Sequence, residues 1–221
     1  MPDTGFIQAV HHGKRNEQQA GLFLAKIYEN SDGEAPLFIS DGWFYSEVIS
    51  QTYCHYEAQP YQGRGRPKLP KRILNKELKY AQVVKERDAR GRLVKVIDKV
   101  VIGDRTEILE IIQKSGRSKK INTSFVESRN GKYRKDNVRL ARKTMCHSKK
   151  TNYHDAHIDL LTVNFNYCRE NEALKELINP NAEPFEQKYQ RKSPAMAEGL
   201  CDKILTLKEV LMRRVPQPTL L

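Results

Sequence analysis

The order of apolar and polar positions in the first sixty residues is that of an α/β fold. Residues 6–12 are rich in apolar side chains, residues 17–30 repeat apolar positions at helical spacing, and residues 37–39 form a short apolar run typical of a buried strand. A further helix is expected over residues 43–53. This strand-helix-strand order predicts a mixed sheet with helices packed against it.

Two more strands are predicted at residues 80–85 and 93–101, on either side of a turn at residues 88–91. We interpret the two strands as a β-hairpin inserted ahead of a later helix. Residues 61–70, which precede the hairpin, are rich in Gly, Pro and Arg and are expected to form a linker.

The last third of the chain predicts a smaller, helical part. Residues 153–169 carry apolar side chains at helical spacing, and residues 179–194, rich in Pro and Asn, are expected to be loop. Thr206 followed by Glu209 is the pattern of a capping box, which predicts a short amphipathic helix over residues 207–214. We expect four parts: 1–58, the first part of a core; 59–113, linker and hairpin; 114–178, two helices; and 179–221, a tail.

Charge is distributed unevenly along these parts. Residues 114–150 contain thirteen Lys and Arg but only two acids, Glu127 and Asp136, so they supply a net +11 of the formal +12 of the whole chain. Residues 1–60, by contrast, contain eight acids and three basic side chains. A solvated charged face would mix the two signs, so the basic segment indicates a polyanionic partner such as DNA.

No apolar run approaches the roughly 20 residues that a membrane-spanning helix needs, and no signal-peptide pattern follows Met1. The four cysteines are widely scattered, without the paired spacing of a zinc site or a disulfide framework. We therefore expect reduced thiols, no membrane partner and a cytoplasmic protein.

Three blocks of residues carry a resemblance to a known family. The blocks are Phe38-Ile39-Ser40-Asp41-Gly42-Trp43 with Tyr45; Asn122, Thr123, Ser124, Glu127, Arg129, Asn130 and Arg134 with Arg139-Leu140, Arg142-Lys143-Thr144 and Ser148-Lys149; and Ser193-Pro194-Ala195-Met196-Ala197 with Gly199-Leu200. In these blocks the chain resembles the DDE catalytic domain of transposases of the insertion-sequence-one family.

The resemblance implies a ribonuclease-H-like α/β fold in which three carboxylates hold two Mg²⁺ (or Mn²⁺) ions that promote DNA strand cleavage and transfer. It implies that Asp41 and Glu127 are catalytic residues and metal ligands, and that the protein acts as a homo-oligomer on element ends and target DNA. The residues that we expect to bind DNA are Arg64, Arg66, Arg129, Asn130, Arg134, Lys135, Arg139, Arg142, Lys143 and Lys149.

The family's first catalytic aspartate has no counterpart here. Only twelve residues precede Gly13, and Asp3 lies in a Pro-Asp-Thr-Gly sequence typical of a turn, so no catalytic role is assigned to it. We therefore expect a truncated or split-gene product that lacks the first strands of the sheet and is inactive in isolation. The alternative function is a non-catalytic DNA-binding remnant, or a competitor of intact transposase.

Local alternatives also remain open. Ser40-Asp41-Gly42 fits an ordinary turn or helix cap, Ser124 with Glu127 fits a capping box, and Asn130-Gly131 fits a tight hairpin instead of a helix.

Residues 63–68, Gly-Arg-Gly-Arg-Pro-Lys, resemble an AT-hook, in which an extended Arg-Gly-Arg-Pro segment enters an A·T-rich minor groove. The same residues also fit a flexible basic linker.

Overall fold

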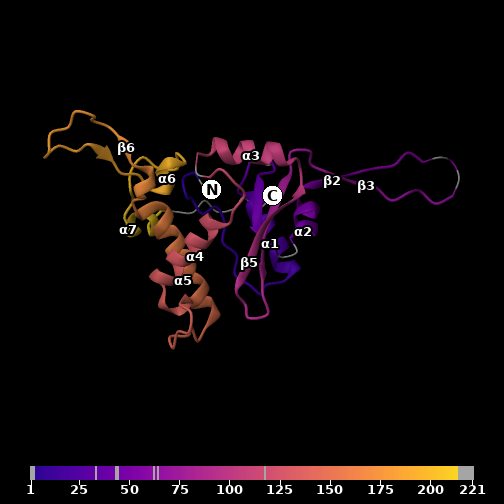
Figure 1. Cartoon of the computed structure of the whole chain (residues 1–221), viewed down its shortest axis with the longest axis horizontal. Helices are drawn as coiled ribbons and strands as arrows, with labels where there is room; N and C mark the ends of the chain where they lie inside the picture. The colour runs from indigo at the N-terminus through magenta and orange to yellow at the C-terminus, as the bar shows by residue number, and fades with distance from the viewer. Residues whose placement is uncertain are drawn as a thin grey trace. The chain divides into compact units, whose positions relative to one another are not determined.

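The computed structural model describes residues 3–32, 34–42, 45–61, 63, 65–116 and 118–213 (Figure 1). The chain divides into two units, one made of residues 11–128 and the other of residues 1–10 and 129–221. No helix in the described part of the chain is both long enough and apolar enough to cross a bilayer.

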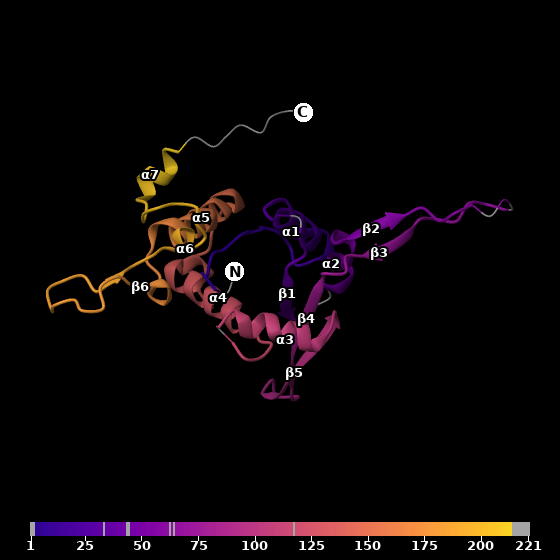
Figure 2. The same cartoon turned by 90° about the horizontal axis from the view of Figure 1, so that it is seen from above.

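The unit of residues 11–128 is built on a three-stranded mixed sheet of order β1-β4-β5 (Figure 2). β1 (Leu37–Asp41) runs parallel to β4 (Lys79–Arg87), and β4 pairs antiparallel with β5 (Leu93–Ile102). The predicted mixed α/β fold and the predicted hairpin are thus both confirmed. Because the hairpin supplies two of the three strands, it is part of the core and not an appendage.

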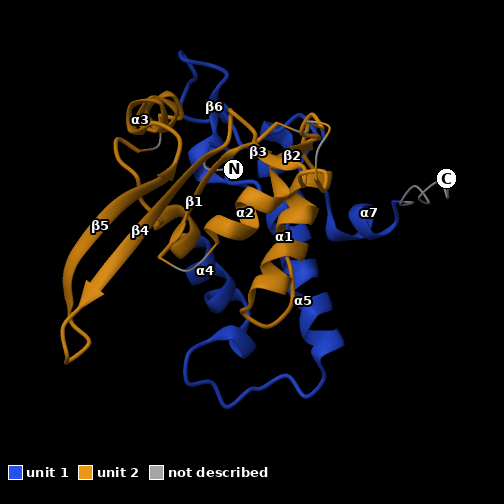
Figure 3. Ribbon diagram, turned by 90° about the vertical axis from the view of Figure 1, so that its right-hand side faces the viewer, with its two compact units in different colours: residues 1–10, 129–221 blue, residues 11–128 orange. Residues whose placement is uncertain are grey.

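The alternation of side chains along β1 and β4 gives the sheet two apolar faces. On one face, Phe38 and Tyr80 pack with α1 (Glu17–Glu29) and α2 (Ser46–Thr52). On the other, Ile39, Ala81 and Val83 pack with α3 (Arg105–Lys114). Figure 3 shows α3 on one side of the strands and α1 with α2 on the other, all within the orange unit.

The helix ends follow from local hydrogen bonds. Asn16 caps α1 by accepting from the backbone N–H of Gln19, and α1 confirms the helix predicted over residues 17–30. α2 is shorter than the predicted helix, of which residues 43 and 44 lie outside the described residues. α3 was not predicted, although Asp104, its cap, is followed at helical spacing by the buried Ile108 and Ile112.

A two-stranded ribbon extends from the same unit (Figures 1 and 2). β2 (Cys54–Glu57) pairs antiparallel with β3 (Lys71–Leu74), and the predicted linker forms most of the loop between them. At the base of the ribbon, Arg72 Nη1 lies 2.6 Å from Oε1 of Glu47 on α2. The segment is therefore a ribbon anchored to the core.

The second unit is mainly helical. α4 (Ser124–Asp136) crosses the boundary between the units, so Asn130-Gly131 lies within a helix and the hairpin alternative is wrong. α5 (Thr151–Val163) continues into a π-helical turn, η2 (Asn164–Cys168), which confirms the helix predicted over residues 153–169.

Short elements complete this unit. They are η1 (Val138–Leu140), η3 (Glu172–Leu174), β6 (Glu176–Leu177), β7 (Tyr189–Gln190), α6 (Pro194–Ala197) and α7 (Leu207–Leu211). β6 and β7 pair, so most of the predicted loop over residues 179–194 closes a small hairpin. The predicted capping box of Thr206 and Glu209 forms at the start of α7, which confirms that helix in shortened form.

The strand predicted over residues 6–12 is wrong, because these residues form no ladder. Instead, the backbone N–H of Ile7 donates to Oδ1 of Asn166 over 3.0 Å, and its carbonyl accepts from Asn166 Nδ2 over 2.9 Å. Asn166 is buried in the π-helical turn. The side chain of Asn166 thus hydrogen-bonds both backbone polar groups of Ile7. In a sheet, a neighbouring strand would satisfy these groups.

The helix α3 offers a direct test of what holds the sheet. Ile108 is fully buried, whereas Ile111 on the same helix is 40% exposed. We expect Ile108→Ala to lower the free energy of unfolding by about 2–5 kcal/mol, because the surrounding side chains cannot fully fill the cavity that the substitution creates. We expect Ile111→Ala to cost much less. Urea unfolding followed by circular dichroism measures both, and equal losses would contradict this role of Ile108.

Candidate functional site

Asp41 is the last residue of β1, where the register pairs it with Val83 of β4. Its carboxylate is exposed, and Oδ2 lies 3.2 Å from Nη2 of Arg15. α2 begins at Ser46 without a side-chain cap, so Asp41 does not cap that helix. An acid at the carboxyl end of a parallel strand stands where open α/β sheets place ligands.

Glu127 lies in the first turn of α4. Its carboxylate accepts from the ammonium of Lys85 and, over 3.3 Å, from the hydroxyl of Thr123. Ser124 donates its hydroxyl to Asn122 instead. The alternative capping box of Ser124 and Glu127 is therefore not the arrangement adopted. The hydrogen bond from Lys85 lowers the pKa of Glu127 below its ordinary value.

Lys85 of β4 links Glu127 to the strand that pairs with β1. Lys85 follows Val83, the register partner of Asp41, by two residues, so its Cα lies about 7 Å further along β4. Because Lys85 binds Glu127, both acids are placed through neighbouring residues of β4, although 85 residues separate them in the sequence.

The surroundings of each acid are cationic. Arg15 accompanies Asp41 and Lys85 accompanies Glu127, so both carboxylates are matched by positive charge. Tyr45 lies close enough to Asp41 to feel its charge, and burial, followed by that charge, raises the pKa of the phenol. The phenol therefore stays protonated at neutral pH.

The donor chemistry suits a hard cation in part. Mg²⁺ is usually held by one or two protein carboxylates together with waters and substrate phosphates, which is what Asp41 and Glu127 can provide. Among the described residues, no group of three or more His, Cys, Asp or Glu side chains is placed to hold a metal ion. Asp41 and Glu127 are therefore candidate carboxylate ligands, and the two-ion site that the family resemblance implies stays a prediction.

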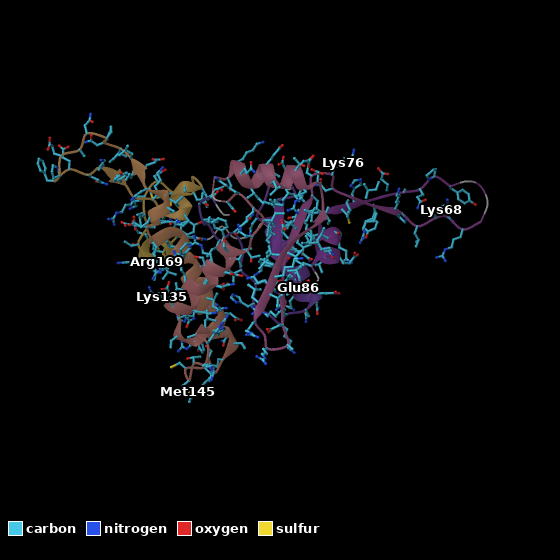
Figure 4. All side chains as sticks on the ribbon, in the orientation of Figure 1. Lys68, Lys76, Glu86, Lys135, Met145 and Arg169 are labelled. Carbon is cyan, nitrogen blue, oxygen red and sulfur yellow. The ribbon has the colours of Figure 1, made fainter. Side chains whose placement is uncertain are left out.

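The basic segment forms an exposed surface in the other unit. Its side chains are Asn130, Arg134, Lys135, Arg139, Arg142, Lys143 and Lys149, all exposed, with Lys135 labelled in Figure 4. Asp136, the nearby acid, is engaged by Arg169. Within the described part of the chain, none of the basic members of this surface forms an ion pair with an acid, so their charges can meet phosphates.

Arg129 differs from its basic neighbours. Its guanidinium carbon lies 4.0 Å from the ring centroid of Phe165, and Nη1 is buried without a hydrogen-bond partner. A Cβ at Gly5, where φ is +72°, would come within 2.0 Å of Arg129 Nη2. Burial lowers the pKa of the guanidinium. The structure therefore shows Arg129 packed on Phe165, while its expected contact with DNA stays a prediction.

Of the two arginines expected to bind DNA in the Gly-Arg-Gly-Arg segment, Arg66 is exposed and Arg64 lies outside the described residues. Sequence reasoning missed Arg15 and Lys85 as partners of the two acids. For Lys85 a signal existed, because it continues the buried alternation of Ala81 and Val83 with a charged side chain.

Comparisons with known proteins give no match: no family model, curated protein or solved structure matches this chain. The candidate site is accordingly defined by its own residues. In the unit of residues 11–128 these are Asp41, Glu127 and the two cations that hold them.

The ion pair of Lys85 and Glu127 can be tested alone. Lys85→Ala removes the donor that stabilises the carboxylate, so we expect the pKa of Glu127 to rise toward its ordinary value. Carboxyl-selective NMR titration measures this shift, with Lys95→Ala, an exposed lysine on β5, as the charge-matched control. An unchanged pKa of Glu127 in Lys85→Ala would mean that the contact does not persist in solution.

Proposed function

We propose that this chain carries part of the catalytic domain of a DDE-type DNA transposase, a metal-dependent enzyme that cuts and joins DNA strands. The observation that carries the proposal is that Asp41 ends β1 beside Val83, while Lys85, two residues further along β4, binds Glu127. The strand β4 thus connects two acids that lie in separate sequence blocks.

In this proposal the two carboxylates hold Mg²⁺ or Mn²⁺ together with phosphate oxygens of the DNA. The ion would polarise the scissile phosphate and lower the pKa of an attacking hydroxyl. Lys85 lowers the pKa of Glu127, and Arg15 lies beside Asp41. The exposed basic residues of 134–149 bind the DNA backbone without reading its sequence.

We include a ribonuclease-H-like fold in the same proposal. A mixed sheet with an acid at the end of a parallel strand supports a ribonuclease-H-like core. In the described part of the chain no strand pairs with the outer edge of β1, the position at which such a core carries a further aspartate. With two carboxylates at the site, we expect cleavage by this chain alone to be weak.

A second candidate is a DNA-binding protein without catalytic activity. It is favoured by the pairing of each acid with a basic side chain, and by the lack of a three-ligand group among the described residues. Both candidates require DNA binding, and metal binding at Asp41 and Glu127 distinguishes them.

DNA binding is expected to depend steeply on salt, because phosphate contacts release counterions. Arg134→Ala combined with Lys135→Ala should weaken binding equally on unrelated duplexes and reduce the slope of log affinity against log salt by about two. Fluorescence anisotropy measures both quantities. The control is Lys95→Ala with Lys99→Ala, which removes two exposed charges from β5. Affinity that does not change with salt would contradict both candidate functions.

Metal binding is expected in the presence of duplex DNA. Mn²⁺ should bind the protein–DNA complex, and Asp41→Asn or Glu127→Gln should each weaken that binding at least tenfold, because each removes a charged ligand. Electron paramagnetic resonance of free Mn²⁺ measures the affinity, and any Mg²⁺-dependent nicking of a labelled duplex should fall to background in the same variants.

The matched control for this experiment is Glu86→Gln. Glu86 follows Lys85 on β4, so strand alternation places its side chain on the opposite face of the sheet. We expect this variant to bind Mn²⁺ as the unchanged protein does. Equal Mn²⁺ affinity in all four proteins, with DNA binding intact, would favour the non-catalytic candidate.

A further inference from the structure

The ribbon of residues 54–74, here called the basic arm, is held together beyond its paired strands. Past the last pair, Glu57 and Lys71, the side chain of Gln59 donates to the carbonyl of Leu69 over 2.8 Å. Closer to the end, the hydroxyl of Tyr61 donates to the carbonyl of Gly65 over 3.3 Å. The two sides of the arm therefore stay together for most of its length.

The arm has the composition of a surface for a polyanion. Within the arm, residues 58–72 contain five Lys and Arg and no acid. Arg66, Lys68 and Lys71 are exposed, and Figure 4 labels Lys68 toward the outer end of the arm. Arg72 is the exception, because it anchors the base of the arm to Glu47. The free charges thus lie outward of the anchor.

Two glycines lie near the end of the arm. Gly63 and Gly65 have φ of +78° and +80°, and a Cβ added at either would meet nothing within 4 Å. Side chains beside the end are exposed: Tyr61 is 60% and Leu69 78% accessible. These residues contribute nothing to the packing of the core, so packing does not explain the arm.

We propose that the basic arm is a second DNA contact, whose end enters the minor groove of A·T-rich duplex. This inference rests on DNA being the partner of the proposed function, and it adds a site and a sequence preference. From Cys54 to Gly63 the arm can span about 30 Å, enough to reach a groove away from the core. A minor groove about 6 Å wide admits the glycine-containing end but not the paired strands.

Arginine side chains favour the minor groove of A·T tracts over that of G·C-rich DNA. A·T tracts narrow the minor groove and deepen its negative potential, which attracts inserted arginine side chains. Arg66 adjoins Gly65, where the lack of a side chain lets the backbone approach the groove floor. G·C pairs place an amino group in that groove and would obstruct the same approach.

The experiment compares two duplexes of equal length, one with a central A·T tract and one rich in G·C. Three variants are compared with the unchanged protein: Arg66→Ala with Lys68→Ala; a shortened arm in which Asn-Gly replaces residues 58–70; and the control Lys95→Ala with Lys99→Ala. The short turn continues the register of Glu57 with Lys71, and circular dichroism checks that each variant folds.

We expect the unchanged protein to prefer the A·T duplex, and both arm variants to lose about tenfold in affinity for it while losing less on the G·C duplex. Netropsin, which fills A·T minor grooves, should reduce binding of the unchanged protein but not of the shortened one. The control should weaken binding to both duplexes equally or not at all.

Three outcomes would overturn the inference. Equal losses on both duplexes would show that the arm adds only charge, and unchanged affinity in the shortened protein would show that the arm does not contact DNA. A loss unaffected by netropsin would exclude the minor groove. If the unchanged protein binds neither duplex, the proposed function fails as well, so the two failures are distinguishable.

Discussion

The parallel pairing of β1 with β4 is the constraint on which the rest of the candidate site depends. Its register sets Asp41 beside Val83, and the two-residue repeat of a strand then places Lys85 on the same face. A shift of one residue would turn Lys85 to the opposite face and take Glu127 with it, or break their ion pair. The positions of Asp41 and Lys85 thus follow from backbone hydrogen bonds, and a side-chain ion pair links Glu127 to them.

That register is itself fixed by burial on both faces. Tyr80 and Ala81 are neighbours on β4, both fully buried, and they face different helices. Slipping the strand by one residue would exchange them, forcing the large ring under α3 and opening a cavity under α1 and α2. Ser40 adds a polar restraint, because its hydroxyl lies 2.8 Å from that of Tyr80. The core therefore specifies the geometry of a surface site that contains no core residue.

The sequence predicted the elements whose signals are local. The sequence signals for α1, β1, the hairpin of β4 and β5, and α5 are periodicity, capping residues and turn residues. The candidate acids Asp41 and Glu127 were indicated by the family resemblance. The features that the sequence could not predict depend on residues far away along the chain. The strand expected over residues 6–12 has strand-like composition, but Asn166 takes its hydrogen bonds. Arg129 looked like its exposed neighbours, but Phe165, 36 residues on, provides a ring for it to stack on.

Arg15 and Lys85, the cations paired with the two acids, connect metal binding with DNA binding in the proposed function. Arg15 and Lys85 balance Asp41 and Glu127 without any ligand, so an arriving metal ion would compete with groups already bound to its carboxylates. Phosphate oxygens accept hydrogen bonds from guanidinium and ammonium groups as carboxylates do. DNA at this corner would therefore draw Arg15 and Lys85 toward its backbone and leave the carboxylates to the ion. By thermodynamic linkage each ligand would then strengthen binding of the other, so the metal would bind where substrate is present.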